Sequence, residues 1–455
     1  MAIQSINPAT EEVLATFEEF TPAQIDAALA QAATAFQEWR RASFAERAAL
    51  LRRAAERLRA EKARYAGLIT DEMGKPIVEA EAEIEKCAWN CEYYAENGAR
   101  FLADEPVATG ARASYVAFEP LGVVLAIMPW NFPFWQVFRA AVPALMAGNT
   151  CLLKHASNVP QCALAVEEVF RAAGFPPGVF QTLLIPSSAV ETLIADDRVQ
   201  AVTLTGSDVA GSQVAMAAGR ALKKTVMELG GSDPFIVLED ADLAAAAETG
   251  ARARCQNTGQ SCIAAKRFIV VDAVAEEFEE RFRAAVSRLR VGPPRERTTQ
   301  IGPLARGDLR DALERQLRAS LAAGARLVLG GTRLEGRGYY FAPTVLADVT
   351  LAMPVCQEET FGPLAAVLRV RDAEEALAVA NGSRYGLGAS VWTRDLERGQ
   401  ALARRLEAGV VFVNGMVASD PRLPFGGVKR SGYGRELGVF GIREFVNIQT
   451  IVVNP

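Results

Sequence analysis

The chain has 455 residues, half of them hydrophobic, and a mean hydropathy of +0.09, which predicts two or more domains with large cores. The formal net charge is −5 and no block of lysine and arginine stands out, which argues against a nucleic-acid partner. The longest apolar stretches, such as 121–128, are too short to span a bilayer, and residues 1–5 lack the basic start and apolar core of a signal peptide.

Cysteine and histidine usage narrows the chemistry further. The seven cysteines are odd in number and form no CxxC pair, which argues against a disulfide framework or a zinc site and predicts a reducing cytoplasm. We therefore expect no metal, no membrane and no nucleic-acid partner. His155 is the only histidine, so a carboxylate is the more attractive candidate for a catalytic base.

The first hundred residues predict helices. Residues 21–24 (TPAQ) have the form of a capping box with proline at the first helical position, and apolar residues follow at helical spacing. Residues 43–46 (SFAE) cap a second, alanine-rich helix in the same way. Cys87 and Cys91 lie one turn apart in a third helix, where we expect them to pack in a core.

From residue 120 onward, apolar runs and helical patterns alternate. The first series of predicted strands is 123–128, 150–154, 179–185 and 201–205, with helices beginning near 133, 158 and 206. The second series has strands 235–238, 268–271, 364–370, 389–392 and 410–413, with helices 242–254, 275–290, 372–381 and 395–407. This alternation predicts two α/β domains in series, each with a parallel sheet, and a hinge at 229–234. The apolar tail 446–453 predicts a terminal strand that needs an edge, which a partner subunit can supply.

Cys262 and Glu228 are the candidates for covalent chemistry. Cys262 closes the run 257–262 (NTGQSC), and Glu228 begins the run 228–231 (ELGG). A thiol and a carboxylate beside small residues can form a nucleophile and a group that activates it or a water. The alternative is that Cys262 is a buried small hydrophobe, as most cysteines in globular chains are.

Three further motifs follow predicted strands or loops. Residues 205–211 (TGSDVAG) lead from a strand into a helix, whose first N–H groups attract phosphate, although an ordinary strand-to-helix turn has the same appearance. Asn131 lies between the prolines of 129–133 (PWNFP) and could donate to a developing oxyanion, or could simply be solvated in a rigid loop. The glycine-dense run 424–436 would let the backbone approach a ligand or partner closely.

The ordered set of motifs resembles the aldehyde dehydrogenase superfamily over nearly the whole chain. The matching segments are PWNFP at 129–133, Lys154, TGS at 205–207, ELGG at 228–231, GQSC at 259–262, EETFGP at 358–363 and PFGGVKRSGYGREL at 424–437. The resemblance implies that Cys262 attacks an aldehyde as a thiolate and that Asn131 holds the oxyanion. A nicotinamide cofactor would accept the hydride, and Glu228 would activate the water that releases the acid. We expect some lowering of the Cys262 pKa from the ordinary value near ~8.5.

The same resemblance implies a cofactor site. Lys154 would bind the adenosine ribose, Ser207 the diphosphate and Glu359 the nicotinamide ribose, with Phe361 near the nicotinamide ring. The full set of expected cofactor residues is Trp130, Lys154, Ser157, Gly206, Ser207, Leu229, Glu359 and Phe361. Ser157 stands where NAD-preferring members often have a glutamate, so we expect NADP to be accepted and preferred, with NAD possible.

The resemblance is strongest to the succinate-semialdehyde dehydrogenases. Arg139, eight residues after Asn131, matches an arginine of that subfamily, and its planar fork suits a carboxylate. Ser419 and Arg422 fall where the subfamily has further substrate contacts. Gln256 stands where some members have a second arginine, and we expect Arg422 to take its place. Arg139 has the alternative role of an ordinary structural salt bridge.

The implied architecture is two Rossmann-like parallel-sheet domains plus a β oligomerisation arm. Residues 1–101 and 121–229 would bind the cofactor, 230–437 would form the catalytic domain, and 102–120 and 438–455 would form the arm of a homodimer or homotetramer. A general aliphatic aldehyde dehydrogenase is the closest alternative. A CoA-acylating enzyme is disfavoured by Glu228, and a non-catalytic structural protein is disfavoured by the intact set of Cys262, Glu228 and Asn131.

Overall fold

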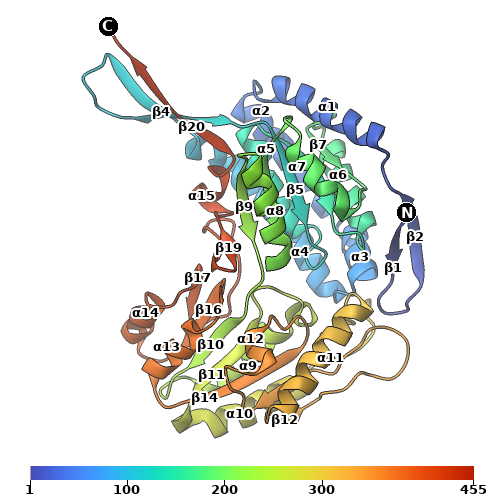
Figure 1. Cartoon of the computed structure of the whole chain (residues 1–455), viewed down its shortest axis with the longest axis vertical. Coiled ribbons are helices and arrows are strands. Elements are labelled where there is room, and N and C mark those ends of the chain that lie inside the picture. Colours follow the sequence, from blue (N-terminus) through green and yellow to red (C-terminus); the bar gives the residue numbers. More distant parts are fainter. Residues whose placement is uncertain (1) are drawn as a thin grey trace.

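The computed structural model describes residues 2–455 and consists of two α/β units with a β arm (Figure 1). The chain begins with an antiparallel hairpin of β1 (Ala2–Ile6) and β2 (Val13–Glu18). Four helices follow, namely α1 (Pro22–Trp39), α2 (Phe44–Ala60), α3 (Lys62–Met73) and α4 (Ile77–Phe101). The two predicted capping boxes are present at Thr21 and Ser43, where each hydroxyl accepts the N–H of the third helical residue.

The first sheet has six strands in the order β19-β9-β8-β5-β6-β7. These are β5 (Val123–Met128), β6 (Thr150–His155), β7 (Phe180–Thr182), β8 (Val199–Thr205), β9 (Lys224–Glu228) and β19 (Gly432–Tyr433). The helices of this unit are α5 (Trp135–Ala147), α6 (Pro160–Ala172), α7 (Val190–Ala195) and α8 (Asp208–Arg220). Every pairing is parallel except that of β19 with β9. The carboxyl ends of the strands therefore share one edge, where ligands of doubly wound sheets bind.

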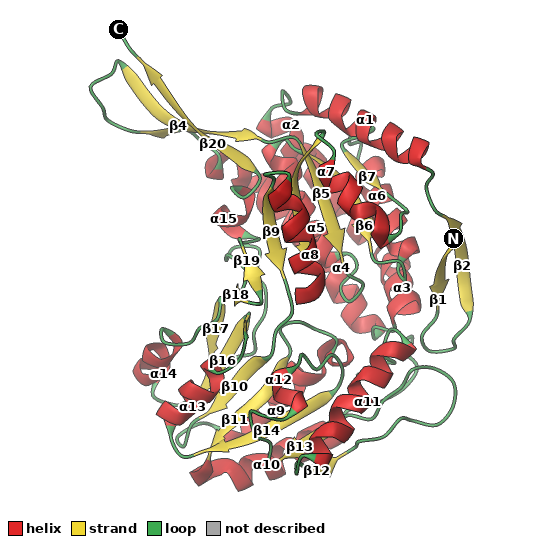
Figure 2. Cartoon of the chain, in the orientation of Figure 1, coloured by secondary structure: helices red, strands yellow, loops and turns green. Residues whose placement is uncertain are grey.

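The second sheet has seven strands in the order β12-β13-β14-β11-β10-β16-β17. These are β10 (Asp233–Val237), β11 (Ala265–Val271), β12 (Arg326–Leu329), β13 (Thr344–Ala347), β14 (Leu364–Val370), β16 (Gly388–Trp392) and β17 (Val410–Val413). The helices are α9 (Leu243–Cys255), α10 (Asp272–Ser287), α11 (Gly307–Ala322), α12 (Pro354–Gln357), α13 (Ala373–Asn381) and α14 (Leu396–Ala403). Helices flank the strands of both large sheets (Figure 2), and the sheet cores are apolar.

The arm is a three-stranded sheet that extends away from both units (Figure 1). β4 (Ala113–Pro120) pairs with β3 (Glu105–Pro106) and, over its whole length, with β20 (Val446–Val453). The terminal strand therefore pairs with β4 of the same chain and does not need a partner subunit to supply the edge. β20 exposes Ile448 and Val452 on one face and Val453 on the other. Short elements complete the fold: β15 (Tyr385–Gly386), β18 (Val428–Lys429) and α15 (Gly438–Ile442).

The predicted fold class is confirmed, with differences in detail. The β1–β2 hairpin, α7, β9, α11, β12 and β13 were not expected, and the strand predicted at 179–185 is limited to 180–182. The chain passes from β9 to β10 within the predicted hinge at 229–234. Near the end it returns to the first sheet at β19, so the two units are connected by more than one crossing. No helix among residues 2–455 is long and apolar enough to cross a membrane.

Candidate active site

Cys262 follows a backbone turn of unusual conformation. Directly after α9, Asn257, Thr258 and Gly259 all have positive φ values of 54°, 57° and 72°. The left-handed region costs a residue with a side chain roughly 1–3 kcal/mol. Gly259 is also required sterically, because a Cβ there would collide with the Gly362 carbonyl. The turn therefore stores strain next to the thiol, and surrounding contacts must hold it in place.

Those contacts join the cysteine loop to the PWNFP loop. Asn257 Nδ2 donates to the carbonyl oxygens of Asn131 at 2.8 Å and Gln260 at 2.9 Å. Asn131 Nδ2 donates to the same Gln260 oxygen at 3.1 Å, and its Oδ1 accepts from Gln136 Nε2 at 3.1 Å. An amide group has two N–H donors, so Asn131 keeps a second donor for a substrate oxygen. Its burial and its three hydrogen bonds orient the side chain as an oxyanion donor requires.

His155 anchors the PWNFP loop from the other side. Its Nε2 lies 2.8 Å from the Pro133 carbonyl oxygen, and its Nδ1 accepts the Ala156 N–H at 2.9 Å. Burial lowers the pKa of His155 to about 4, so the ring is neutral at physiological pH. The only histidine of the chain is thus a structural clamp, which agrees with the expectation that the catalytic base is a carboxylate.

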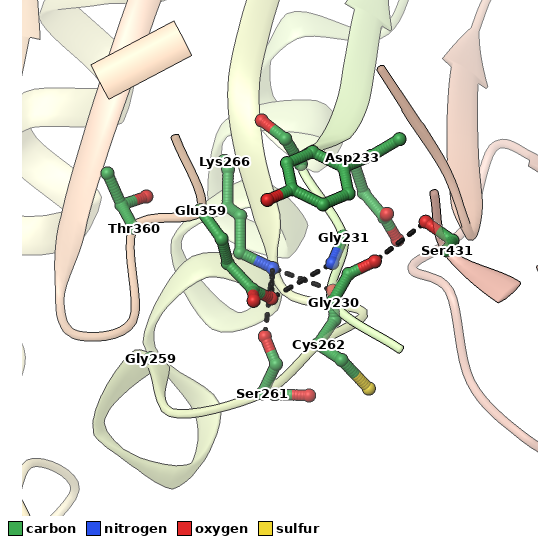
Figure 3. A network of polar contacts seen from close by, with 12 residues as sticks. Gly230, Gly231, Asp233, Gly259, Ser261, Cys262, Lys266, Glu359, Thr360 and Ser431 are labelled. Atoms are coloured by element: carbon green, nitrogen blue, oxygen red, sulfur yellow. Dashed lines mark hydrogen bonds and ion pairs between the residues drawn. The ribbon is translucent and has the colours of Figure 1, made fainter. Parts of the chain in front are cut away.

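Lys266, on β11, holds the backbone around the thiol (Figure 3). Its Nζ donates to the carbonyl oxygens of Ser261 at 3.0 Å and Cys262 at 2.6 Å, and lies 3.4 Å from Glu359 Oε1. Glu359 in turn accepts the Gly231 N–H at 2.9 Å. The Cys262 sulfur points away from this network in Figure 3. The sequence did not indicate a role for Lys266, because this lysine lies in a strand and belongs to none of the recognised motifs.

Glu228 is a buried carboxylate at the end of β9. Neither of its oxygens has a hydrogen-bond partner within the described part of the chain. Burial raises the pKa of Glu228 well above its usual value, and the nearby Arg139 guanidinium opposes this shift. Gly426 (φ 157°) packs so closely that a Cβ would lie 2.7 Å from Glu228 Oε1. A carboxylate with a raised pKa and free oxygens suits a general base for water.

Arg139 lies close to the reacting groups, but its charge already has a partner. It is 3% exposed, forms an ion pair with Glu436, and its guanidinium lies 4.7 Å from the centre of the Phe425 ring. Arg139 acts on the pKa values of both Cys262 and Glu228. Glu436 belongs to the glycine-dense motif, yet sequence reasoning assigned it no role.

A cavity of about 270 Å³ lies beside Cys262. Its lining comprises Val78, Glu79, Ala82, Glu83, Lys86, Phe132, Trp135, Gln136, Arg139, Gln256, Ser261, Cys262, Ile263, Val417, Ala418, Ser419 and Phe425. The structure thus brings Arg139 and Ser419 to the same cavity as the thiol. Arg422 is elsewhere: its side chain is 65% exposed and binds Asp420 at 2.7 Å, and it is not part of this lining.

The expected lowering of the Cys262 pKa is not found. Burial raises the pKa of the thiol to about 12, although Arg139 and Lys266 pull it down. The reason is that the walls of the cavity remove water from the sulfur, while both neighbouring cations are held by carboxylates. Further positive charge or solvent must therefore stabilise the thiolate when it reacts.

A second cavity, of about 400 Å³, lies at the carboxyl edge of the first sheet. Lys154, Ser187, Ser188 and residues of α8 line it, and Lys154 Nζ donates to Ser187 Oγ at 3.4 Å. Ser207 is the N-cap of α8 and accepts the Ala210 N–H at 3.2 Å, so the positive end of this helix faces the same edge. Beyond β6, Ser157 is exposed. These donors and the helix end suit a nucleotide.

The remaining expected cofactor residues do not line this cavity. Leu229 donates its N–H to the Ser431 carbonyl at 3.0 Å, which ties the end of β9 to the glycine-dense loop. The rings of Trp130 and Phe361 meet edge to face at 5.6 Å. Glu359, two residues before Phe361, is partly exposed. Residues 2–455 contain no group of three or more metal-binding side chains.

Comparison with known proteins agrees with this geometry. The model of the aldehyde dehydrogenase family matches residues 1–451, so the chain belongs to that family. A Synechocystis protein named as a probable NADP(+) succinate-semialdehyde dehydrogenase is 55% identical over 451 residues, which cover 99% of each chain. A Mycobacterium tuberculosis succinate-semialdehyde dehydrogenase, also named for NADP(+), is 51% identical over 454 residues, again 99% of each chain. The succinic semialdehyde dehydrogenase of Streptococcus pyogenes, solved with NADP+, superposes with a TM-score of 0.98 at 38% identity, and each chain is covered fully.

Proposed function

We propose that the protein oxidises succinate semialdehyde to succinate with NADP+. The observation that carries this proposal is the cavity that combines Cys262 with cationic and hydroxyl side chains, among them Arg139, Lys86 and Ser419. A carboxylated aldehyde places its carbonyl at the thiol and its carboxylate among those side chains. The identity to relatives named for this reaction supports the same substrate.

The chemical steps follow from the positions of the side chains. The Cys262 thiol gives its proton to solvent and the thiolate adds to the aldehyde carbon, while the oxyanion accepts the free Asn131 N–H and the Cys262 backbone N–H. NADP+, which Lys154, Ser157 and Ser207 would hold, would accept the hydride that leaves the former aldehyde carbon. The product on Cys262 is then a thioester. Glu228 removes a proton from water, which attacks the thioester carbon and releases the acid and the free thiol.

The residues at the ends of β6 and β8 fit NADP+. Lys154 contributes an ammonium group, Ser157 an exposed hydroxyl, and Gly206 and Ser207 the start of α8. A glutamate at position 157 would repel a 2′-phosphate, whereas serine can donate to it. Measurement of kcat/KM with both cofactors tests this assignment, and a strong preference for NAD+ would contradict it.

Assembly and domain roles are part of the same proposal. Residues 1–101 and 121–229 form the cofactor-binding domain, 230–437 the catalytic domain, and 102–120 and 438–455 an arm through which two or four copies associate. The exposed apolar residues of β20 support this role of the arm. The seven free cysteines support a reducing cytoplasm as the place of action.

The decisive experiment is a panel of aldehydes of matched length, with and without a terminal carboxylate. The rate of NADPH formation at limiting aldehyde gives kcat/KM for each. The proposal predicts a clear preference for succinate semialdehyde over butanal. Equal values would indicate a general aliphatic aldehyde dehydrogenase. Turnover that requires CoA and yields acyl-CoA in place of the acid would indicate an acylating enzyme.

A further inference from the structure

Lys86 is a cation in the wall of the Cys262 cavity that no motif predicted. It lies on α4, and its Nζ donates to Ser419 Oγ at 2.8 Å. The amine also lies 4.5 Å from the centre of the Trp135 ring, over which a cation is favourably placed. The contact with Ser419 joins residues 333 positions apart, so the cavity wall is built from both ends of the chain.

The two carboxylates that act on the pKa of Lys86 are bound by other cations. Asp420 and Glu83 both act on its pKa. Asp420 binds Arg422 at 2.7 Å, and Glu83 pairs with the buried Lys75. Within residues 2–455, no carboxylate oxygen forms a salt bridge with Lys86. Its charge is therefore available to a ligand.

Arg139, the other cation of the cavity, differs in this respect. It is paired with Glu436, and its influence reaches Cys262 and Glu228 at the reacting end of the site. Burial and the charge of Arg139 together lower the pKa of Lys86 to about 8. Lys86 is thus the cation of this cavity without an anionic partner.

We propose that Lys86, with Ser419, forms the subsite for the remote carboxylate of the substrate. The inference rests on the proposed function, because only a carboxylated aldehyde uses this subsite. The ammonium group would pair with the carboxylate, and the Ser419 hydroxyl, released from Lys86 or shared with it, would donate a second hydrogen bond. Arg139 would then serve mainly to hold Glu436 and to influence the charges of Cys262 and Glu228.

Lys86→Met tests the subsite, since it removes the charge and keeps a long apolar stem. We measure kcat/KM for succinate semialdehyde and butanal with NADP+ in the wild type, Lys86→Met, Lys86→Arg and Lys62→Met. Lys62, at the start of α3, is outside the cavity lining and provides the same substitution as a matched control. Loss of a buried charged partner predicts that the ratio of the two kcat/KM values falls about 30-fold or more in Lys86→Met. Lys86→Arg should keep most of the ratio, and Lys62→Met all of it.

Product inhibition gives a second readout that does not depend on turnover of the charged aldehyde. Succinate should inhibit butanal oxidation competitively, with a Ki that rises in Lys86→Met by a similar factor. An unchanged ratio and an unchanged Ki in Lys86→Met would overturn the inference while leaving the proposed function intact. Absence of a preference for succinate semialdehyde in the wild type would instead overturn the proposed function.

Discussion

Asn131 carries the clearest residue-level expectation. Asn131→Ala removes the side-chain donor to the oxyanion and the hydrogen bond to the Gln260 carbonyl. Loss of one oxyanion donor typically lowers turnover ~100-fold or more, so steady-state kcat should fall by at least that factor. Thermal unfolding of the variant controls for structural damage. A kcat near that of the wild type would refute the assignment.

The Lys86 subsite predicts a specific pH dependence. The pKa of Lys86 is lowered to about 8 by burial and Arg139, against the opposing effect of Cys87, Asp420 and Glu83. Lys86 is charged below that pH and neutral above it. The ratio of kcat/KM for succinate semialdehyde to that for butanal should therefore decline as pH rises through about 8. Titration of Cys262 and Glu228 affects both aldehydes and cancels in the ratio. Glu79, a cavity carboxyl whose pKa burial raises to about 7, changes charge at lower pH than Lys86. A ratio independent of pH would contradict the role of Lys86.

Residues whose roles could be predicted from the sequence differ physically from those whose roles could not. Cys262, Asn131 and Glu228 lie in short motifs whose chemistry is local. Lys86 and Lys266 depend on contacts between elements, and a lysine on an amphipathic helix or in a strand carries no sign of its burial. Arg422 shows the reverse error, because its nearness to Ser419 in sequence does not place it in the cavity.

At the scale of elements, the turn between α9 and Cys262 requires glycine at position 259, and this requirement can be tested. Gly259→Ala combines a left-handed backbone with a collision against Gly362, so it should displace the Cys262 loop. We expect a loss of stability of about 1–3 kcal/mol from the backbone alone and a larger proportional loss of activity. Thermal unfolding and kcat measure the two effects.

Gly324→Ala is the matched control for that substitution. Gly324 also has a positive φ, of 105°, but an added Cβ there would meet no atom within 4 Å. It should therefore show only the backbone cost and retain activity. Equal behaviour of the two variants would show that the close approach of Gly259 to Gly362 is unimportant.

The alternation of strands and helices was predictable, whereas the edges of the sheets were not. Central parallel strands are buried on both faces and appear as continuous apolar runs. β1 was missed because one of its two buried positions is Ser5, a polar residue that interrupts the apolar alternation. The Ser5 hydroxyl oxygen accepts a hydrogen bond from Gln161 Nε2 at 3.2 Å. β19 is only two residues long, which is too short for any periodicity.

At the scale of the whole molecule, the arm predicts how copies associate. The double substitution Ile448→Lys and Val452→Lys places charge on the exposed apolar side of β20, where Ile448 is 61% and Val452 51% exposed. Light scattering coupled to size exclusion should show an oligomer for the wild type and a smaller species for the variant. Leu222→Lys, at an exposed apolar residue outside the arm, should leave the mass unchanged. A monomeric wild type would contradict the proposed arm function.

The most direct test of the whole account is to trap the covalent intermediate. Glu228→Gln removes the base for water, so incubation with succinate semialdehyde and NADP+ should stop after one turnover. Mass spectrometry of the intact protein and of its peptides should then show one succinyl group, attached to the peptide that contains Cys262. An unmodified protein, or a succinyl group on another residue, would contradict the assignment of nucleophile, base and substrate together.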